Sequence, residues 1–170
     1  MRTITGIVVH CSASSWGDVA AIRRWHTDPP PKGRGWRDIG YHFVVLNGRR
    51  TARAAFDPAD DGRIELGRDL DGDGDVGEEV GAHCLEVNAS TLGVCLIGNQ
   101  LRDFTDHQVA IAAGLVAGLC QRFGLTADQV TGHHEFPSGR HKACPVISMP
   151  DFRTQVGGLL AAWKAAGGTP

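Results

Sequence analysis

The sequence predicts an α/β fold, a single domain with a central, mixed and mostly β sheet flanked by helices. Short apolar runs with strand character alternate along the chain with segments of helical periodicity, as in a sheet covered by helices. The length of 170 residues is that of one ordinary domain, large enough to bury a core without disulfides. The sequence shows no internal repeat, so we expect residues 1–170 to form one domain.

The first two elements are expected before residue 30. Gly6–His10 is a short apolar run that ends in a histidine, which is typical of a buried strand. Asp18 is a favourable N-cap, and apolar residues recur at helical spacing from there to His26. Three consecutive prolines at 29–31 then stop the helix. We therefore expect a strand followed by one short helix.

A hairpin is expected next. Tyr41–Leu46 is rich in aromatic and β-branched residues, which favours a strand. This run leads into Asn47 and Gly48, the strongest short hairpin signal in the chain, because both residues tolerate positive φ. The return strand should then cover roughly Arg49–Ala55.

The second half of the chain alternates one strand with two helices. Thr91–Ile97 is almost continuously apolar, which indicates a buried strand. Thr105 and Gln108 have the spacing of a capping box, and an apolar face continues from there to a stop at Gly124. A last helix should occupy residues 150–166, before two glycines.

Composition and charge exclude several classes of function. The formal net charge is −2 and no run of Lys and Arg occurs, so we expect no nucleic-acid partner. No apolar stretch approaches the length of a membrane span and the N-terminus lacks a signal peptide, so we expect no membrane insertion and a cytoplasmic product. The five cysteines show no CxxC and no disulfide-framework spacing, which favours reduced thiols.

A metal site is predicted in Gly132–Pro145, which holds three His, one Lys and one Cys. Its glycines and prolines prevent a regular helix, and imidazole and thiolate are ligands that Zn²⁺ prefers. An extended pair points its side chains opposite ways, so only one of His133 and His134 should bind the metal, together with Cys144. The best candidate for a third ligand is His10, at the end of the first strand. Three protein ligands leave one position open, as in catalytic zinc sites.

Two further residues have the chemistry that amide hydrolysis needs beside such a metal. Tyr41 alone reads as a packed aromatic residue, and Lys142 alone as a surface lysine. Next to a metal, Lys142 would stabilise an oxyanion, and the Tyr41 hydroxyl would orient water or relay a proton. Cys11 faces away from its neighbour His10 along the strand, so we expect it to pack and not to bind the metal.

Several segments carry a resemblance to a known family, and they are Val9–Ala13, Trp36–Phe43, Gly81–His83, Asn88, Ser90–Gly98, His133–Glu135 and Lys142–Pro145. In this order they resemble the zinc-dependent N-acetylmuramoyl-L-alanine amidases of the amidase_2 type. That family includes the T7-like phage lysozymes and the peptidoglycan recognition proteins. The similarity runs from about residue 7 to residue 163. The family fold, a mostly β sheet with helices packed on it, agrees with the predicted elements.

The resemblance implies roles for seven residues of this chain when it is carried over residue by residue. The implied roles are zinc ligands (His10, His133 and Cys144), catalytic residues (Tyr41 and Lys142) and substrate-groove residues (His83 and Asn88).

One segment departs from the phage lysozymes, the longer and more acidic insertion at residues 69–79. The loop Asp69–Asp75 matches the early positions of an EF-hand, whose aspartates bind Ca²⁺. Val80, however, occupies the position of the bidentate Glu. Two interpretations remain open, an incomplete and weak Ca²⁺ site and a solvated acidic loop on the rim of the groove.

The expected function is zinc-dependent hydrolysis of the amide between N-acetylmuramic acid and L-alanine in peptidoglycan. We expect a monomeric phage or prophage endolysin that stays in the cytoplasm of the producing cell and reaches the wall after membrane permeabilisation.

Three other functions remain in competition with this one. A non-catalytic peptidoglycan-binding module would keep recognition alone. A cytosolic muropeptide-recycling amidase resembles this chain too, but that branch typically has Asp in place of the cysteine ligand. A cysteine peptidase would use Cys144 or Cys84 with a histidine, and its activity would survive a chelator.

Overall fold

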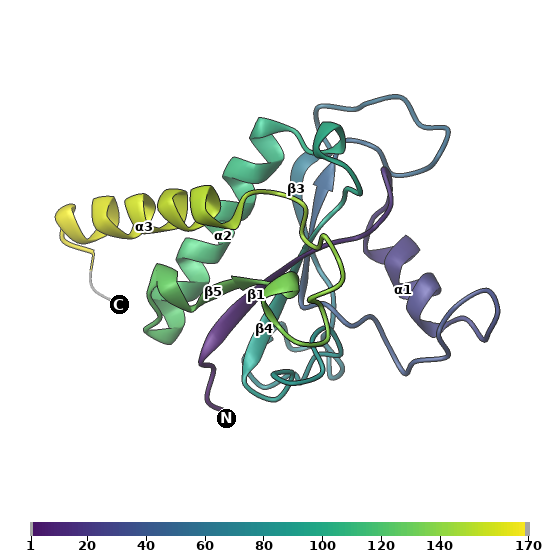
Figure 1. The fold of residues 1–170 in the computed structure, drawn as a ribbon, viewed down its shortest axis with the longest axis horizontal. Helices are drawn as coiled ribbons and strands as arrows, with labels where there is room; N and C mark the ends of the chain where they lie inside the picture. Colours follow the sequence, from purple (N-terminus) through teal and green to yellow (C-terminus); the bar gives the residue numbers. More distant parts are fainter. Residues whose placement is uncertain (1, 169–170) are drawn as a thin grey trace.

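The centre of the computed structural model, which describes residues 2–168, is a five-stranded sheet with strand order β3-β2-β4-β1-β5 (Figure 1). Strands β1, β2, β4 and β5 run parallel to their neighbours in this order, and β3 pairs antiparallel with β2 at one edge. The predicted α/β class with a mixed sheet is therefore confirmed. The strands are β1 (Gly6–Cys11), β2 (Phe43–Asn47), β3 (Asp61–Leu66), β4 (Thr91–Leu96) and β5 (Val130–Gly132).

Helices cover both faces of the sheet (Figure 1). Helix α2 packs along β3, β2 and β4, with α3 beside it, and α1 lies on the opposite face over a second apolar cluster. The same strands contribute side chains to both apolar clusters, because alternate residues of a strand face opposite sides of the sheet. The helices are α1 (Val19–Thr27), α2 (Asp106–Phe123), α3 (Met149–Ala165) and three short 3₁₀ segments, η1 (Leu101–Asp103), η2 (Ala127–Gln129) and η3 (His133–Glu135).

The predicted helix signals act largely as expected. The Asp18 carboxylate accepts a hydrogen bond from the Ala21 amide at the start of α1, and Thr105 caps α2. Gly124, at φ +66, ends α2 in the left-handed conformation. Gln108 differs from its predicted role in a capping box. Its Nε2 instead donates to two buried sheet carbonyls, those of Val45 and Ile97, at 2.9 and 3.0 Å.

The predicted return strand over Arg49–Ala55 is wrong. The strand that pairs antiparallel with β2 is β3, and residues 48–60 form a long connection between the two strands. The turn begins as expected, because Gly48 has φ +78. The chain after it is charged and exposed, and the connection is held by Arg50, whose guanidinium pairs with Asp60 and Glu65. A local turn signal could not foresee these longer-range ion pairs.

The parallel strands bring together the histidines at the carboxyl ends of β1 and β5. Carboxyl ends of parallel strands share one edge of a sheet, where ligands of α/β folds bind. His10 lies near the end of β1, and His133 follows the last residue of the neighbouring β5. Among residues 2–168, no helix combines the length and the apolar character that a membrane span requires.

Candidate metal centre and active site

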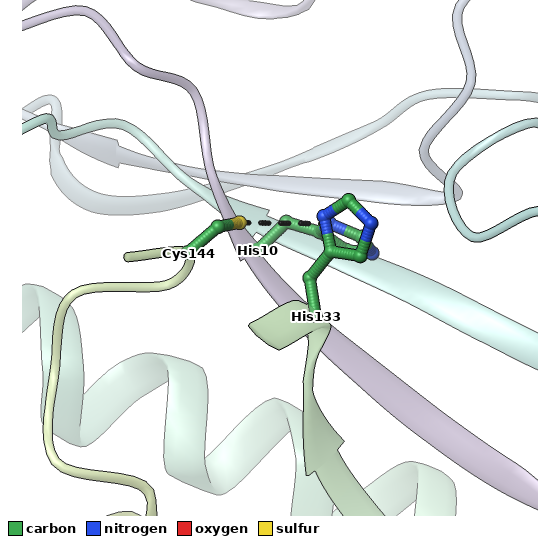
Figure 2. Close-up of side chains that lie close together, drawn as sticks. All are labelled: His10, His133 and Cys144. Atoms are coloured by element: carbon green, nitrogen blue, oxygen red, sulfur yellow. Dashed lines mark hydrogen bonds between the residues drawn. The ribbon is translucent and has the colours of Figure 1, made fainter. Parts of the chain in front are cut away.

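The three predicted zinc ligands meet in the structure (Figure 2). His10 comes from β1, His133 from the start of η3, and Cys144 from the connection between η3 and α3. One ligand atom from each lies within 4.8 Å of the others, and His10 Nδ1 is 3.8 Å from Cys144 Sγ. Tetrahedral zinc places a nitrogen and a sulfur ligand about 3.4–3.6 Å apart, from bond lengths of about 2.0–2.1 and 2.3 Å. The donor set and its spacing therefore fit zinc.

Hydrogen bonds leave the same nitrogen of both imidazoles available to a metal. His10 Nε2 lies 3.1 Å from His83 Nδ1, and His133 Nε2 lies 3.5 Å from Ser138 Oγ. The Ser138 hydroxyl donates to a Glu86 carboxylate oxygen at 2.6 Å, so its own oxygen can accept from His133. With a proton on each Nε2, both Nδ1 atoms keep a free lone pair.

Burial favours the protonation states that His10 needs but opposes the one that Cys144 needs. Burial and the nearby His83, His133 and Lys142 lower the pKa of His10 well below its ordinary value, so this imidazole is neutral. Contact with the Cys11 thiol and burial raise the pKa of the Cys144 thiol. Loss of that proton therefore requires compensation by a bound cation, as in other thiolate metal sites.

The loop that carries Cys144 is fixed by backbone contacts. The Cys11 amide donates to Cys144 Sγ at 3.3 Å, which favours negative charge on the sulfur. His134 holds the Cys144 carbonyl through its amide, at 2.8 Å, and through its ring Nδ1, at 2.9 Å. His134 is thus turned away from the ligand cluster, and of the neighbouring pair it is His133 that joins it.

A cavity of about 440 Å³ opens beside the ligands, and Tyr41 and Lys142 both line it. The Tyr41 ring lies 5.0 Å from the His10 ring, centroid to centroid. Burial raises the pKa of Tyr41 well above its ordinary value, so its hydroxyl keeps its proton. Within residues 2–168 that hydroxyl makes no hydrogen bond and is free to bind a ligand. Lys142 lines the cavity together with His133, and its positive charge lowers the pKa of both His10 and His133.

The two predicted substrate-groove residues occupy different surroundings. His83 lines the cavity but is buried and contacts His10, packed on β4 where Gly93 has no side chain. A Cβ on Gly93 would lie 2.6 Å from His83 Cγ, so only glycine leaves this space. Asn88 is not among the residues that line the cavity. Its Oδ1 accepts the amides of His83 and Cys84 at 2.8 Å, so it shapes the turn that carries His83.

Replacing His83 by alanine should weaken zinc binding by about 10–100-fold, the usual cost of removing a hydrogen-bond partner of a ligand histidine. Zinc affinity can be measured by competition with a coloured chelator. His83→Asn is the matched control, because its side-chain oxygen can accept from His10 and should restore part of the affinity. Zinc affinity equal to wild type in His83→Ala, with weaker substrate binding, would favour the predicted groove role instead.

Ser138 and Glu86 were not predicted as parts of the site. They come from two separate loops, and only the fold brings them to His133. No pattern in the sequence marks either residue.

The acidic insertion also brings carboxylates together. Asp69 and Asp71 lie near the buried Glu79, and Asp71 and Asp73 lie near the exposed Glu78. The charges of Asp73 and Asp71 raise the pKa of Glu78, as expected for crowded acids. The aspartates also accept hydrogen bonds from the loop's own backbone. Calcium binding stays a prediction.

Comparisons with known proteins identify the family. Residues 1–146 match the family model described as N-acetylmuramoyl-L-alanine amidase. The chain belongs to this amidase family. It is 34% identical to the endolysin of Klebsiella phage KP32, over 84% of this chain and 81% of that protein. It is 32% identical to the endolysin of Escherichia phage T7, over 84% and 81% of the two chains. The family predicted from the motifs is therefore confirmed.

Solved structures share the fold of this amidase. The N-acetylmuramoyl-L-alanine amidase LysC from Clostridium intestinale superposes with a TM-score of 0.67 at 22% identity, covering 91% of this chain and 86% of that chain. Wild-type Drosophila PGRP-LB superposes with a TM-score of 0.59 at 20% identity, covering 97% and 82%. At this level of identity the likeness extends to the fold.

Proposed function

We propose that this amidase hydrolyses the bond between N-acetylmuramic acid and L-alanine in the peptidoglycan wall, with zinc held by His10, His133 and Cys144. The observation that carries the proposal is the meeting of two imidazoles and one thiol beside a cavity that holds Tyr41 and Lys142. When bound at such a site, zinc polarises a carbonyl and lowers the pKa of water to about 7.

The residues around the metal centre supply the remaining chemistry. Lys142 reaches the cavity without a salt bridge among the described residues, so its ammonium can stabilise the developing oxyanion. The protonated Tyr41 hydroxyl can donate to the attacking water or to the carbonyl, and relay a proton to the leaving amine. His83 and the Ser138–Glu86 pair orient the two ligand histidines.

The geometry disfavours the competing functions. A binding module without catalysis has no need of Tyr41 and Lys142 beside three convergent ligands. The thiols of Cys144 and Cys84 have raised pKa values, whereas a peptidase nucleophile needs a lowered one. The side-chain partners of Cys84 are Glu86 and Ser138, and neither is the histidine base that such a mechanism requires.

Two assays on purified sacculi test the activity, one for new amino groups and one for new reducing sugar ends. Amide cleavage should release new amino groups and no new reducing sugar ends. Binding to sacculi without release would favour the non-catalytic module. Cleavage of soluble muramoyl peptides alone, with intact sacculi untouched, would favour the recycling amidase.

Tyr41→Phe should lower kcat by about 10²-fold, at the low end of what positioned acid–base groups contribute. The substitution removes only the hydroxyl and keeps the ring that packs against His10 and His26. Zinc content and melting temperature should therefore match wild type. An unchanged kcat would make Tyr41 a packing residue and nothing more.

Calcium at Asp69–Asp75 is a separate part of the proposal, and its effect should be on stability and not on the reaction. Because the bidentate Glu is absent at Val80, the melting temperature should rise only at Ca²⁺ levels well above those of the cytosol. Melting curves across a Ca²⁺ titration, with Mg²⁺ as control, check this. If both ions shift wild type and Asp71→Asn/Asp73→Asn alike, the loop is a solvated rim.

We also propose that the enzyme acts as a monomeric endolysin, made in the cytoplasm and admitted to the wall when the membrane is permeabilised. The curated endolysins that it resembles support this role. Sedimentation of the purified chain measures its oligomeric state.

A further inference from the structure

The charges of the cavity are all of one sign. Its lining includes two permanent cations, Arg34 and Lys142, and no Asp or Glu. Lys142 lies near the metal ligands and is assigned to the oxyanion. Arg34 has no role in the proposed reaction, so its charge is available to another part of the substrate.

Arg34 stands apart from the metal ligands. Its guanidinium lies over the Trp36 ring, 5.1 Å from the centroid. A series of ring contacts leads from Trp36 through His26 and Tyr41 to His10, with centroid separations of 4.7, 5.5 and 5.0 Å. Arg34 therefore lies at the opposite end of this series from His10. A group bound by Arg34 is therefore expected to be a part of the substrate other than the scissile amide.

The loop that presents Arg34 is held in place. The Trp36 amide donates to the His26 carbonyl at 2.8 Å, and the Gly35 amide donates to the Asp28 carbonyl at 2.9 Å. Gly35 has φ +67, a conformation that glycine adopts without strain. The backbone that follows Arg34 is thus held in place, and the exposed Arg34 side chain rests on the Trp36 ring.

Among the described residues, no carboxylate neutralises Arg34. Within residues 2–168 its guanidinium forms neither a salt bridge nor a hydrogen bond, whereas Arg23 on the neighbouring helix pairs with Asp38 at 2.7 Å. Its charge also acts on the cavity wall, because burial and Arg34 together lower the pKa of His26 to about 4. Arg34 lines a cavity in which a ligand can supply the missing anion.

We propose that Arg34 binds a free carboxylate in the peptide part of the substrate and so selects which stem peptides are cut. The inference rests on the proposed function. A guanidinium recognises a carboxylate with two parallel hydrogen bonds and distinguishes it from an amide of the same shape. An extended peptide advances about 3.3–3.6 Å per residue, so the second and third residues beyond the scissile amide can extend along the cavity away from the metal ligands. Both can carry a carboxylate, which occurs either free or amidated.

Two matched pairs of soluble muramoyl peptides test this. One pair differs only in a free or amidated carboxylate on the second residue, and the other only in a free or amidated carboxylate on a third-residue diaminopimelate. Wild type should cleave the free acid of one pair with a kcat/KM at least about 10-fold higher than its amide, as expected for a charge-assisted hydrogen bond. Arg34→Gln should bring that ratio close to one with unchanged zinc content. The pair that loses its ratio identifies the carboxylate.

Arg37→Gln is the matched control, because Arg37 is an exposed arginine three residues along and does not line the cavity. It should keep the wild-type ratio. Equal cleavage of acid and amide by wild type, or a ratio that persists in Arg34→Gln, would overturn the inference and leave the amidase activity standing. A ratio lost equally in both variants would also overturn it, since it would reflect general charge. No cleavage of any of the four peptides would contradict the proposed function itself.

Discussion

Cys144→Ser should purify without stoichiometric zinc and lose more than about 10³-fold in amide hydrolysis. Thiolate is the only anionic ligand of the proposed set, and without the metal the pKa of water stays near 15.7 instead of about 7. His10 and His133 would remain near each other, but two neutral imidazoles hold zinc far more weakly than the complete set. Zinc per chain, measured by atomic emission after purification without chelator, and initial rates on sacculi check both effects.

Cys84→Ser is the matched control for this substitution. Cys84 is a second buried thiol near the site but outside the ligand cluster. This variant should keep zinc and most of the activity. Full zinc content in Cys144→Ser would remove Cys144 from the metal centre, and an inactive but zinc-loaded Cys84→Ser would revive the cysteine-peptidase alternative.

Lys142→Ala should keep one zinc per chain and lose about 10²–10³-fold in kcat, or roughly 3–4 kcal/mol of transition-state stabilisation, as measured for oxyanion donors elsewhere. The side chain lines the cavity and touches the reaction only through its charge, so the folded structure should not change. Steady-state kinetics on a soluble muramoyl peptide separate kcat from KM.

Arg140→Ala, a change at an exposed cation of the same loop that does not line the cavity, is the control and should behave as wild type. If Lys142→Ala retains wild-type kcat, the oxyanion must be stabilised by other groups. If it loses zinc, Lys142 supports the ligand loop and not the transition state.

The elements that the sequence predicted well are those governed by local chemistry. The caps at Asp18 and Thr105 and the stop at Gly124 depend on hydrogen bonds between near neighbours, and they lie where expected. The return strand did not, because the course of residues 48–60 depends on ion pairs of Arg50 with Asp60 and Glu65. Strand β5 is only three residues long, and no local periodicity marks it.

In the candidate site, too, some residues could be predicted from the sequence and others depend on the whole fold. Residue type and strand-end position were enough to propose His10 and Cys144 as ligands, and the motifs added His133. The contact of His83 with His10 could not be foreseen, because it depends on the space above Gly93 in a different strand. The Ser138–Glu86 pair joins two loops whose meeting is a property of the whole fold.

The most direct test of the account is mass spectrometry of purified peptidoglycan digested by the zinc-loaded enzyme, with and without a chelator. We expect released peptides that begin with a free L-alanine amine, and glycan strands that remain uncut. The chelator should abolish their release, and added zinc should restore it. Release that persists after zinc removal, or cleavage within the glycan or within the peptide, would contradict a zinc-dependent N-acetylmuramoyl-L-alanine amidase.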